Sequence, residues 1–419
     1  MSEYEWTRNA LVTYCLLTLV FLSSWTDING IFAELPQIIL TQPEGWKLGT
    51  YLALITNLGN IAPLILVLWK CYYRKKSLDL VPINYVIILI GMSACFLLII
   101  FWRQTSVVRN QHYSISLLIL ALFLSLLDCT SSISFADYVQ KYSRQFTSAL
   151  FLGESLTSIV PSLLAAAQGN GHLDCVPSPN GTQAIYQTAR FSVSVYFFCL
   201  FTILTISFVS FIILQWTSVA KNARSKTTKS RDETDSNCLP LESWRLSRTS
   251  YVLLSLGCVY TSSILFGMLL SISTYVLMPY GHQIFYLGTI LSPWMFTVIW
   301  ILGIKKPLIS KRFLLLFILI GSIGFAFELY IALKSPCPMW VGSIKGSVTI
   351  LIVWLITYVL LGYPRLVIAN YVRNSSSSGM FWYGVHVQIG ALLGSIAAYL
   401  LVEIYSLFRE RTPCEVIQC

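Results

Sequence analysis

The chain has 419 residues, of which 56% are hydrophobic and only 11% are charged, and its mean hydropathy is +0.69. Soluble domains carry charge at about a quarter of their positions, so this composition excludes an ordinary soluble protein. A formal net charge of +10 would suit a nucleic-acid partner. However, the basic residues form short clusters between apolar runs, which indicates a membrane protein that binds no nucleic acid.

Eleven apolar runs are long enough to cross a bilayer, since a spanning helix needs roughly 20 mostly apolar residues. The runs are continuous rather than alternating, which excludes a membrane β-barrel and predicts an all-α integral membrane fold. The predicted spans are 10–31, 48–69, 81–101, 113–135, 146–167, 191–214, 251–278, 284–302, 313–333, 347–368 and 380–402.

The basic residues orient these spans. With the N-terminus inside, twenty of the 28 Lys and Arg residues lie in inner segments and eight in outer ones, as the positive-inside bias requires. The odd number of spans then places the C-terminus outside. A cleaved signal peptide over the first run is disfavoured, because only Arg8 precedes the run and no small-residue cleavage site follows it.

A polar stretch divides the spans into two groups. Residues 216–248 are rich in Lys, Arg, Asp and Glu and are predicted to be a cytoplasmic linker. Residues 1–215 then form an N-terminal bundle of six spans, and 249–419 form a C-terminal bundle of five with an extracellular tail. This division is typical of a carrier built from two bundles that rock against each other.

Four of the eleven cysteines are predicted to face the oxidising exterior, where disulfides form; they are Cys175, Cys337, Cys414 and Cys419. A bond between Cys337 and Cys414 would join the loop before the tenth span to the tail. Spacing alone leaves pairings with Cys419 or Cys175 open.

Two glycosylation motifs test the orientation. Asn180-Gly181-Thr182 lies in a long outer loop and is a candidate acceptor. Asn374 begins a second motif on the inner side, where it should stay unmodified.

Polar groups inside a membrane span are costly and often mark a substrate or ion path. In the second span, Asn57 and Asn60 are three residues apart and share one helix face. Gly59 and Pro63 flank the pair, so the helix is expected to bend there.

Two acidic residues are predicted at similar depth in adjacent spans. Asp128 lies about 10 Å, and Glu154 about 12 Å, from the inner end of its helix at 1.5 Å per residue. The two carboxyl groups could therefore share a site or a proton, with Thr130 and Ser131 beside them. The alternative is that each carboxyl only hydrogen-bonds a neighbouring helix.

Other polar and aromatic side chains are weaker candidates. Near the outer end of the first span, a polar group is expected to line a vestibule or cap the helix: Asp27, Asn29 and Glu34. Three aromatic residues near polar groups could stack on a planar ligand: Trp25, Tyr275 and Trp294. The remaining candidates are a buried acid in span nine and a group in the last span: Glu328, Tyr383, His386 and Gln388.

No enzyme motif is present. The four histidines lie on separate segments, and the sequence contains no P-loop, His-Glu-x-x-His or Gly-x-Ser-x-Gly. The sequence therefore predicts no catalytic site, no metal and no cofactor.

Residues 25–36, Trp-Thr-Asp-Ile-Asn-Gly-Ile-Phe-Ala-Glu-Leu-Pro, resemble the first-span signature of the eukaryotic riboflavin transporter family, solute carrier family 52. Further segments are similar to the same family: 43–46, 57–63, 127–132, 153–154, Pro161, 167–171, 279–281 and 387–394. The matches run in order along nearly the whole chain. Departures from the family pattern are Asp27, where relatives are usually uncharged, and the segments 265–267 and 363–365.

The resemblance implies eleven helices, an inner N-terminus and an outer C-terminus. It also implies a fold similar to equilibrative nucleoside transporters and the major facilitator architecture, sodium-independent riboflavin uptake at the plasma membrane, and a Cys337–Cys414 disulfide. The alternatives are a carrier of nucleosides or other heterocycles, and a cell-surface receptor without transport. The oligomeric state is open, and a monomer is consistent with the sequence.

Riboflavin fits the buried polar groups: amides suit the edge of its ring, and acids and hydroxyls suit its ribityl chain. Alternating access would then expose a mid-membrane site to each side in turn. The expected substrate-binding residues are Trp25, Asn29, Asn57, Asn60, Asp128, Thr130, Ser131, Glu154, Tyr275 and Gln388. Glu34 or Glu154 is expected to link the transport rate to pH.

Overall fold

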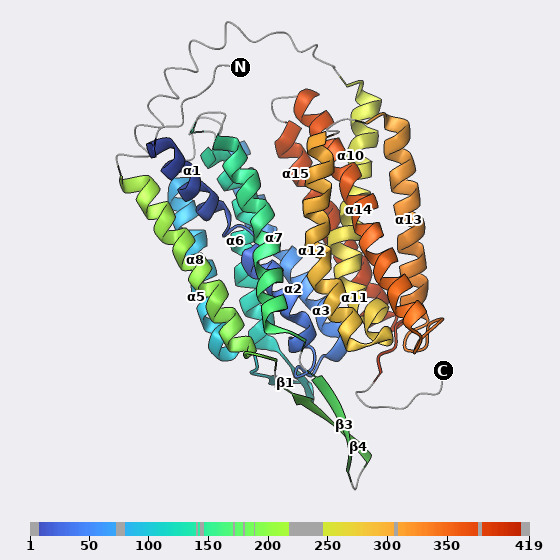
Figure 1. Cartoon of the computed structure of the whole chain (residues 1–419). Helices are drawn as coiled ribbons and strands as arrows, with labels where there is room; N and C mark the ends of the chain where they lie inside the picture. Colours follow the sequence, from blue (N-terminus) through green and yellow to red (C-terminus); the bar gives the residue numbers. More distant parts are fainter. Residues whose placement is uncertain are drawn as a thin grey trace, which may run out of the picture.

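Long helices occupy nearly every apolar run of the sequence (Figure 1). The computed structural model describes residues 8–72, 80–139, 141–142, 146–170, 172–178, 181–187, 189–217, 246–305, 309–375 and 379–411. Within these ranges, ten helices are long and apolar enough to cross a membrane, and one bent pair brings the number to eleven. The predicted all-α membrane fold is therefore confirmed. Most of the predicted linker, residues 218–245, lies outside the described ranges.

Described residues up to 217 are called the first half here, and those from 246 onward the second half. The first half contains α1 (Arg8–Phe21), α2 (Thr26–Ile38), the 3₁₀ turn η1 (Gly45–Lys47), α3 (Leu48–Leu58), α4 (Ile61–Tyr72), α5 (Val81–Phe101), α6 (Ile115–Val139), α7 (Thr147–Gln168) and α8 (Val193–Trp216). The second half contains α10 (Arg248–Ser262), the π-helical turn η3 (Ser263–Met268), α11 (Leu269–Leu277), the 3₁₀ turn η4 (Met278–Tyr280), α12 (His282–Lys305), α13 (Lys311–Leu333), α14 (Ile344–Ser375), α15 (Gly379–Tyr399) and the π-helical turn η5 (Leu400–Ile404).

Two short antiparallel hairpins accompany the helices, and the sequence analysis did not predict them. Strands β1 (Ser106–Val108) and β2 (Gln111–Tyr113) join α5 to α6, and β3 (His172–Ser178) and β4 (Gly181–Gln187) join α7 to α8. Both lie at one end of the helices (Figure 1). This end is called the hairpin end below.

The first predicted span is not one helix. Two helices, α1 and α2, replace it and meet at a bend of 52°. The hydroxyls of Ser23 and Ser24 donate to the carbonyls of Val20 and Phe21, at 2.7 and 2.8 Å, instead of extending the helix. The predicted end at residue 31 is wrong, because α2 continues to Ile38.

This break changes where the polar residues of the first span lie. Asp27 stands in the first turn of α2, and Asn29 follows it. Both residues are therefore inside the bundle, and their expected place near the outer end of the span is corrected. Helix α2 starts close to the middle of the molecule and runs toward the hairpin end (Figure 1).

The two halves meet along a few helices. In Figure 1, α1, α5, α6, α7 and α8 lie on one side of the molecule and α10 to α15 on the other. Between them, α3 contacts α11 and α15, while α2 and α7 contact α12. Residues on these helices are therefore the ones that can meet across the halves.

Close glycine contacts join η3 to α15. A side chain at Gly394 would overlap the carbonyl oxygen of Ser263, and one at Gly267 would overlap the backbone of Gly394. Gly390 meets the carbonyl of Val259 in the same way. Gly390 and Gly394 therefore serve close helix packing, since only small residues allow two helix backbones to approach this closely.

We predict that Gly394→Ala lowers the free energy of unfolding by about 1–3 kcal/mol, because the added methyl group overpacks the η3–α15 contact. The matched control is Gly384→Ala on the same helix, where an added Cβ would meet nothing within 4 Å. Thermal unfolding in detergent measures both variants. Equal midpoints for the two would contradict the packing role.

Candidate functional site

Asn29 joins α2 to α7 in the first half. Its amide nitrogen donates to the carbonyl of Thr157 at 3.3 Å and to the hydroxyl of Ser158 at 3.2 Å. Trp25, at the break before α2, is half-buried. Asn29 therefore lies beside α7, and Trp25 stands four residues before it at the break.

Asp27 and Asp128 bring two carboxyl groups together. Both side chains are fully buried, and their carboxyl groups lie within electrostatic range of each other between α2 and α6. Asp27 also accepts the backbone N–H of Ile28 at 2.9 Å. Within the described part of the chain, neither oxygen of Asp128 has another hydrogen-bond partner. Two charged carboxylates would repel each other here, whereas a shared proton turns the contact into a hydrogen bond.

The carboxyl group that acts on Asp128 is that of Asp27, and a site shared by Asp128 and Glu154 stays a prediction. The break between α1 and α2 places Asp27 opposite Asp128, and sequence depth alone could not reveal this. Glu154 stands on α7, and its carboxylate lies within electrostatic range of the Tyr383 hydroxyl on α15. Glu154 is therefore close enough to α15 of the second half to interact with it electrostatically.

Two polar side chains of the first half, one of them at the interruption between α3 and α4, keep unused hydrogen-bonding capacity. The amide of Asn57 donates to Ala53 at 2.7 Å, and that of Asn60 donates to Asn57 at 3.0 Å. Among the described residues, the side-chain oxygen of Asn60 is buried without a partner, as is the hydroxyl of Thr130 on α6. Ser131 is occupied, because its hydroxyl donates to the Asp128 carbonyl at 2.8 Å. Asn60 and Thr130 can thus accept a ligand at little structural cost.

The other acidic candidates are placed differently. Glu34 is buried and accepts the side-chain amide of Gln168, the last residue of α7, at 2.8 Å. Glu328 on α13 is buried beside Thr357 of α14, away from the other acids. His386 contacts the carbonyl of Trp382 in its own helix at 2.5 Å, and Gln388 is half-buried further along α15.

The halves are joined at the hairpin end by aromatic and polar contacts. The ring of Tyr275 packs against Trp46 and Phe408, with centroids 5.9 and 5.3 Å away. The hydroxyl of Thr274 donates to the Trp46 carbonyl at 2.7 Å, and that of Thr50 donates to the Ser271 carbonyl at 2.9 Å. In this structure Tyr275 therefore closes the hairpin end.

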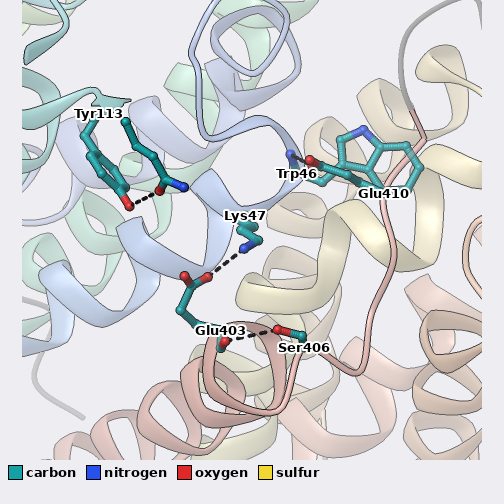
Figure 2. Close-up of polar contacts among 7 residues, drawn as sticks. Trp46, Lys47, Tyr113, Glu403, Ser406 and Glu410 are labelled. Carbon is teal, nitrogen blue, oxygen red and sulfur yellow. Dashed lines mark hydrogen bonds and ion pairs between the residues drawn. The ribbon is translucent and has the colours of Figure 1, made fainter. Parts of the chain in front are cut away.

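A latch of four residues completes this closure (Figure 2). Lys47 Nζ lies 2.9 Å from Glu403 Oε2, and the backbone N–H of Trp46 donates to Glu410 Oε2 at 3.0 Å. Gly45 has a φ of +57°, and a side chain there would meet the same Glu410 oxygen. We call Trp46, Lys47, Glu403 and Glu410 the latch.

Glu44, the residue before η1, attaches this turn to the first half. Glu44 accepts the backbone N–H and the hydroxyl of Ser114, both at 2.5 Å, just before α6 begins. A carboxylate at a helix N-terminus satisfies unpaired N–H groups and the helix dipole. Glu44 thus anchors η1 to the first half, while Lys47 reaches the second.

Helix α12 of the second half adds hydrogen bonds to α2 and α7 of the first half. His282 contacts the Pro36 carbonyl at 2.7 Å, and Tyr286 donates to the Ala165 carbonyl at 3.1 Å. Trp294, expected to stack on a ligand, instead donates its indole N–H to Ser162 at 3.0 Å. All the cross-half hydrogen bonds described above lie toward the hairpin end, so this end is closed in the structure.

The contacts of the latch could not be predicted from the sequence. Trp46 and Glu410 are separated by 364 positions, and no spacing rule joins them. The one available signal was a pair of acids in a segment that follows the last span. Cys337 is disulfide-bonded, but Cys414, Cys419 and Asn180 lie outside the described residues. The Cys337–Cys414 pairing and the glycosylation therefore stay predictions.

We predict that charge reversal of the latch opens the hairpin end. The side chains of Lys47 and Glu403 are 36% and 27% exposed, so their pair contributes only about 0.2–1 kcal/mol. Labelling of a Thr50→Cys reporter by a membrane-impermeant maleimide should rise about two- to tenfold in Lys47→Glu. The Lys47→Glu/Glu403→Lys exchange should return labelling toward the starting rate, and the exposed Lys345→Glu should leave it unchanged. Faster labelling in the exchange than in the single variant would contradict the pairing.

We also predict that Asp27→Asn is tolerated and Asp27→Ala is not. The amide can still donate to Asp128, whereas alanine leaves a buried carboxyl without a partner at a cost of about 1–3 kcal/mol. The unfolding midpoints of the two variants in detergent measure the difference. Equal destabilisation would show that Asp27 and Asp128 are not partners.

Comparisons with known proteins agree with this architecture. Residues 9–410 match the family model described as solute carrier family 52, riboflavin transporter. "Riboflavin transporter 2" of Salmo salar is 30% identical, covering 96% of this chain and 98% of that protein. The human solute carrier family 52, riboflavin transporter, member 3 is 28% identical, covering 97% and 99%.

Solved structures share the fold at low identity. A bacterial homologue of the human lysosomal transporter Spinster, crystallised in an inward-facing and unoccupied conformation, has a TM-score of 0.53 and 12% identity, covering 96% of this chain and 86% of that one. The nucleoside transporter NupG has a TM-score of 0.52 and 12% identity, covering 95% and 92%. The fold is thus that of major facilitator-type transporters.

Proposed function

Because the chain belongs to solute carrier family 52, the riboflavin transporters, we propose that it carries riboflavin across the plasma membrane by alternating access. One observation carries the proposal from the structure. Among the described residues, Asn60 and Thr130 of the first half each carry a buried polar atom without a hydrogen-bond partner. The two halves of the protein are joined at the hairpin end. A neutral, hydroxyl-rich solute would supply the missing partners.

The chemistry of riboflavin fits this part of the first half. The ring has a planar edge with a donor and acceptors, which suits the amides of Asn57 and Asn60. The ribityl hydroxyls can donate to Glu154 and exchange hydrogen bonds with Thr130. Asp128 contributes its free acceptor capacity beside Asp27.

In the proposed cycle, the two bundles rock about the site and open each end in turn. The hairpin end is extracellular and the N-terminus cytoplasmic, as the basic residues predict. The structure then corresponds to a state closed to the outside. Glu34 and Glu154 are the proposed links to pH, and no sodium site is needed for a neutral substrate.

Uptake of labelled riboflavin into liposomes tests the function. We expect saturable uptake above that of empty vesicles, unchanged when choline replaces sodium. Excess unlabelled riboflavin should compete, whereas uridine should not. Absence of uptake by correctly folded protein would refute the proposal, and equal competition by uridine would favour a general heterocycle carrier.

Substitution at the unpartnered groups should weaken uptake selectively. Asn60→Ala is expected to raise the KM for riboflavin about tenfold, the cost of about one hydrogen bond in a desolvated site. Ser210→Ala is the control, because its hydroxyl only bonds its own helix at Ile206. A KM unchanged in Asn60→Ala would remove this residue from the site.

A further inference from the structure

A cationic side chain lies within the membrane part of α14. Arg365 is inside the candidate span Ile344–Val372. Within the described residues, Arg365 has no acidic partner at salt-bridge distance, and its Nη1 is buried without a hydrogen bond. An unpaired cation at membrane depth is costly, and such residues usually mark a functional site.

Aromatic groups of the second half hold this guanidinium in place. Its central carbon lies 4.3 Å from the centre of the Phe266 ring, a contact that stabilises a cation through the ring's negative face. Phe266 stacks on Phe296 of α12, with centroids 5.9 Å apart and planes 14° apart. The Tyr383 hydroxyl of α15 also interacts with the guanidinium. Residues of η3 and α15, with α12 behind them, thus hold the Arg365 side chain of α14.

The position of Phe266 depends on an irregular turn. Phe266 belongs to the π-helical turn η3, and π-helical turns inside α-helices frequently occur at functional sites. The neighbouring Gly267 packs directly on the backbone of Gly394, so α15 holds the turn in place. The turn therefore determines where the Phe266 ring lies, and the ring in turn contacts the Arg365 guanidinium.

An acceptor faces this cluster from the first half. The Glu154 carboxylate of α7 lies within electrostatic range of the Tyr383 hydroxyl. Donors carried by the second half thus have an acceptor carried by the first half within electrostatic range. A ligand placed between them needs acceptors on one side and donors on the other.

We propose that Arg365, held by Phe266 and Tyr383, is a substrate-binding residue of the second half that donates to the carbonyl edge of a planar heterocycle. The inference rests on the proposed function and adds to it the part of the substrate that the second half recognises. A guanidinium presents several donors in one plane, which matches two adjacent acceptors of a ring edge. The hydroxyl chain then extends toward Glu154 and the first half.

Arg365→Gln and Arg365→Lys test the proposal by uptake of labelled riboflavin into liposomes. Loss of a charged hydrogen bond should raise KM at least about tenfold in Arg365→Gln, with the maximal rate within about twofold of the original. Lumichrome keeps the carbonyl edge of the ring and lacks the ribityl chain, so its inhibition constant should rise by the same factor. Arg312→Gln is the control, because Arg312 is exposed at the start of α13.

The lysine variant guards against misfolding, because it keeps the charge and loses only the planar donor pair. It should show the same rise in the lumichrome constant with normal surface expression. A reduced maximal rate with unchanged KM and lumichrome constant would overturn the proposal. So would recovery of transport by Glu154→Arg/Arg365→Glu, which would assign the two residues to an ion pair. Riboflavin uptake by the parent protein separates these outcomes from failure of the proposed function itself.

Discussion

The break between α1 and α2 is the constraint on which the arrangement of the first half depends. A continuous helix would carry Asp27, Asn29 and Glu34 along one straight axis. The bend of 52° redirects the chain instead, so Asp27 meets Asp128 on α6 and Asn29 reaches Thr157 and its neighbour on α7. Glu34, further along α2, accepts the side-chain amide of Gln168 at the end of α7. The polar content of this segment, unusual for a membrane span, is what allows one short helix to fasten two others.

At the hairpin end, likewise, one short segment contacts both halves of the protein. The turn η1 is fixed to the first half through Glu44 and Ser114, and it presents a cation and a free N–H to acids that follow α15. Aromatic packing around Tyr275 excludes water beneath them. The ionic contacts are partly exposed and individually weak, which suits a closure that has to open in each cycle. A deeply buried ion pair would cost several kcal/mol to break and would hold the protein in one state.

The sequence could predict the parts of the structure that depend on local composition. The length of the apolar runs predicted the membrane-spanning helices. The partner of Asp128 could not be found this way, because it depends on a bend made by hydroxyls that return to their own helix at Val20 and Phe21. The partners of Lys47 and Trp46 lie more than 350 positions away in the chain. The depth of a residue in the membrane, counted along a straight helix, predicts its neighbours only where that helix is not bent.

Unused hydrogen-bonding capacity inside the described part of the bundle indicates where a ligand could bind. Gln168 donates to one oxygen of Glu34, while the other oxygen is buried without a hydrogen-bond partner. Asn60 and Arg365 each retain a buried polar atom without a partner, and they lie in different halves. A fold that leaves such atoms unpaired loses stability at each of them, since an unmade hydrogen bond in an apolar setting costs about 1–3 kcal/mol. A ligand bound between the halves would recover that cost on both sides at once, and its binding would favour a conformation in which the halves close around it.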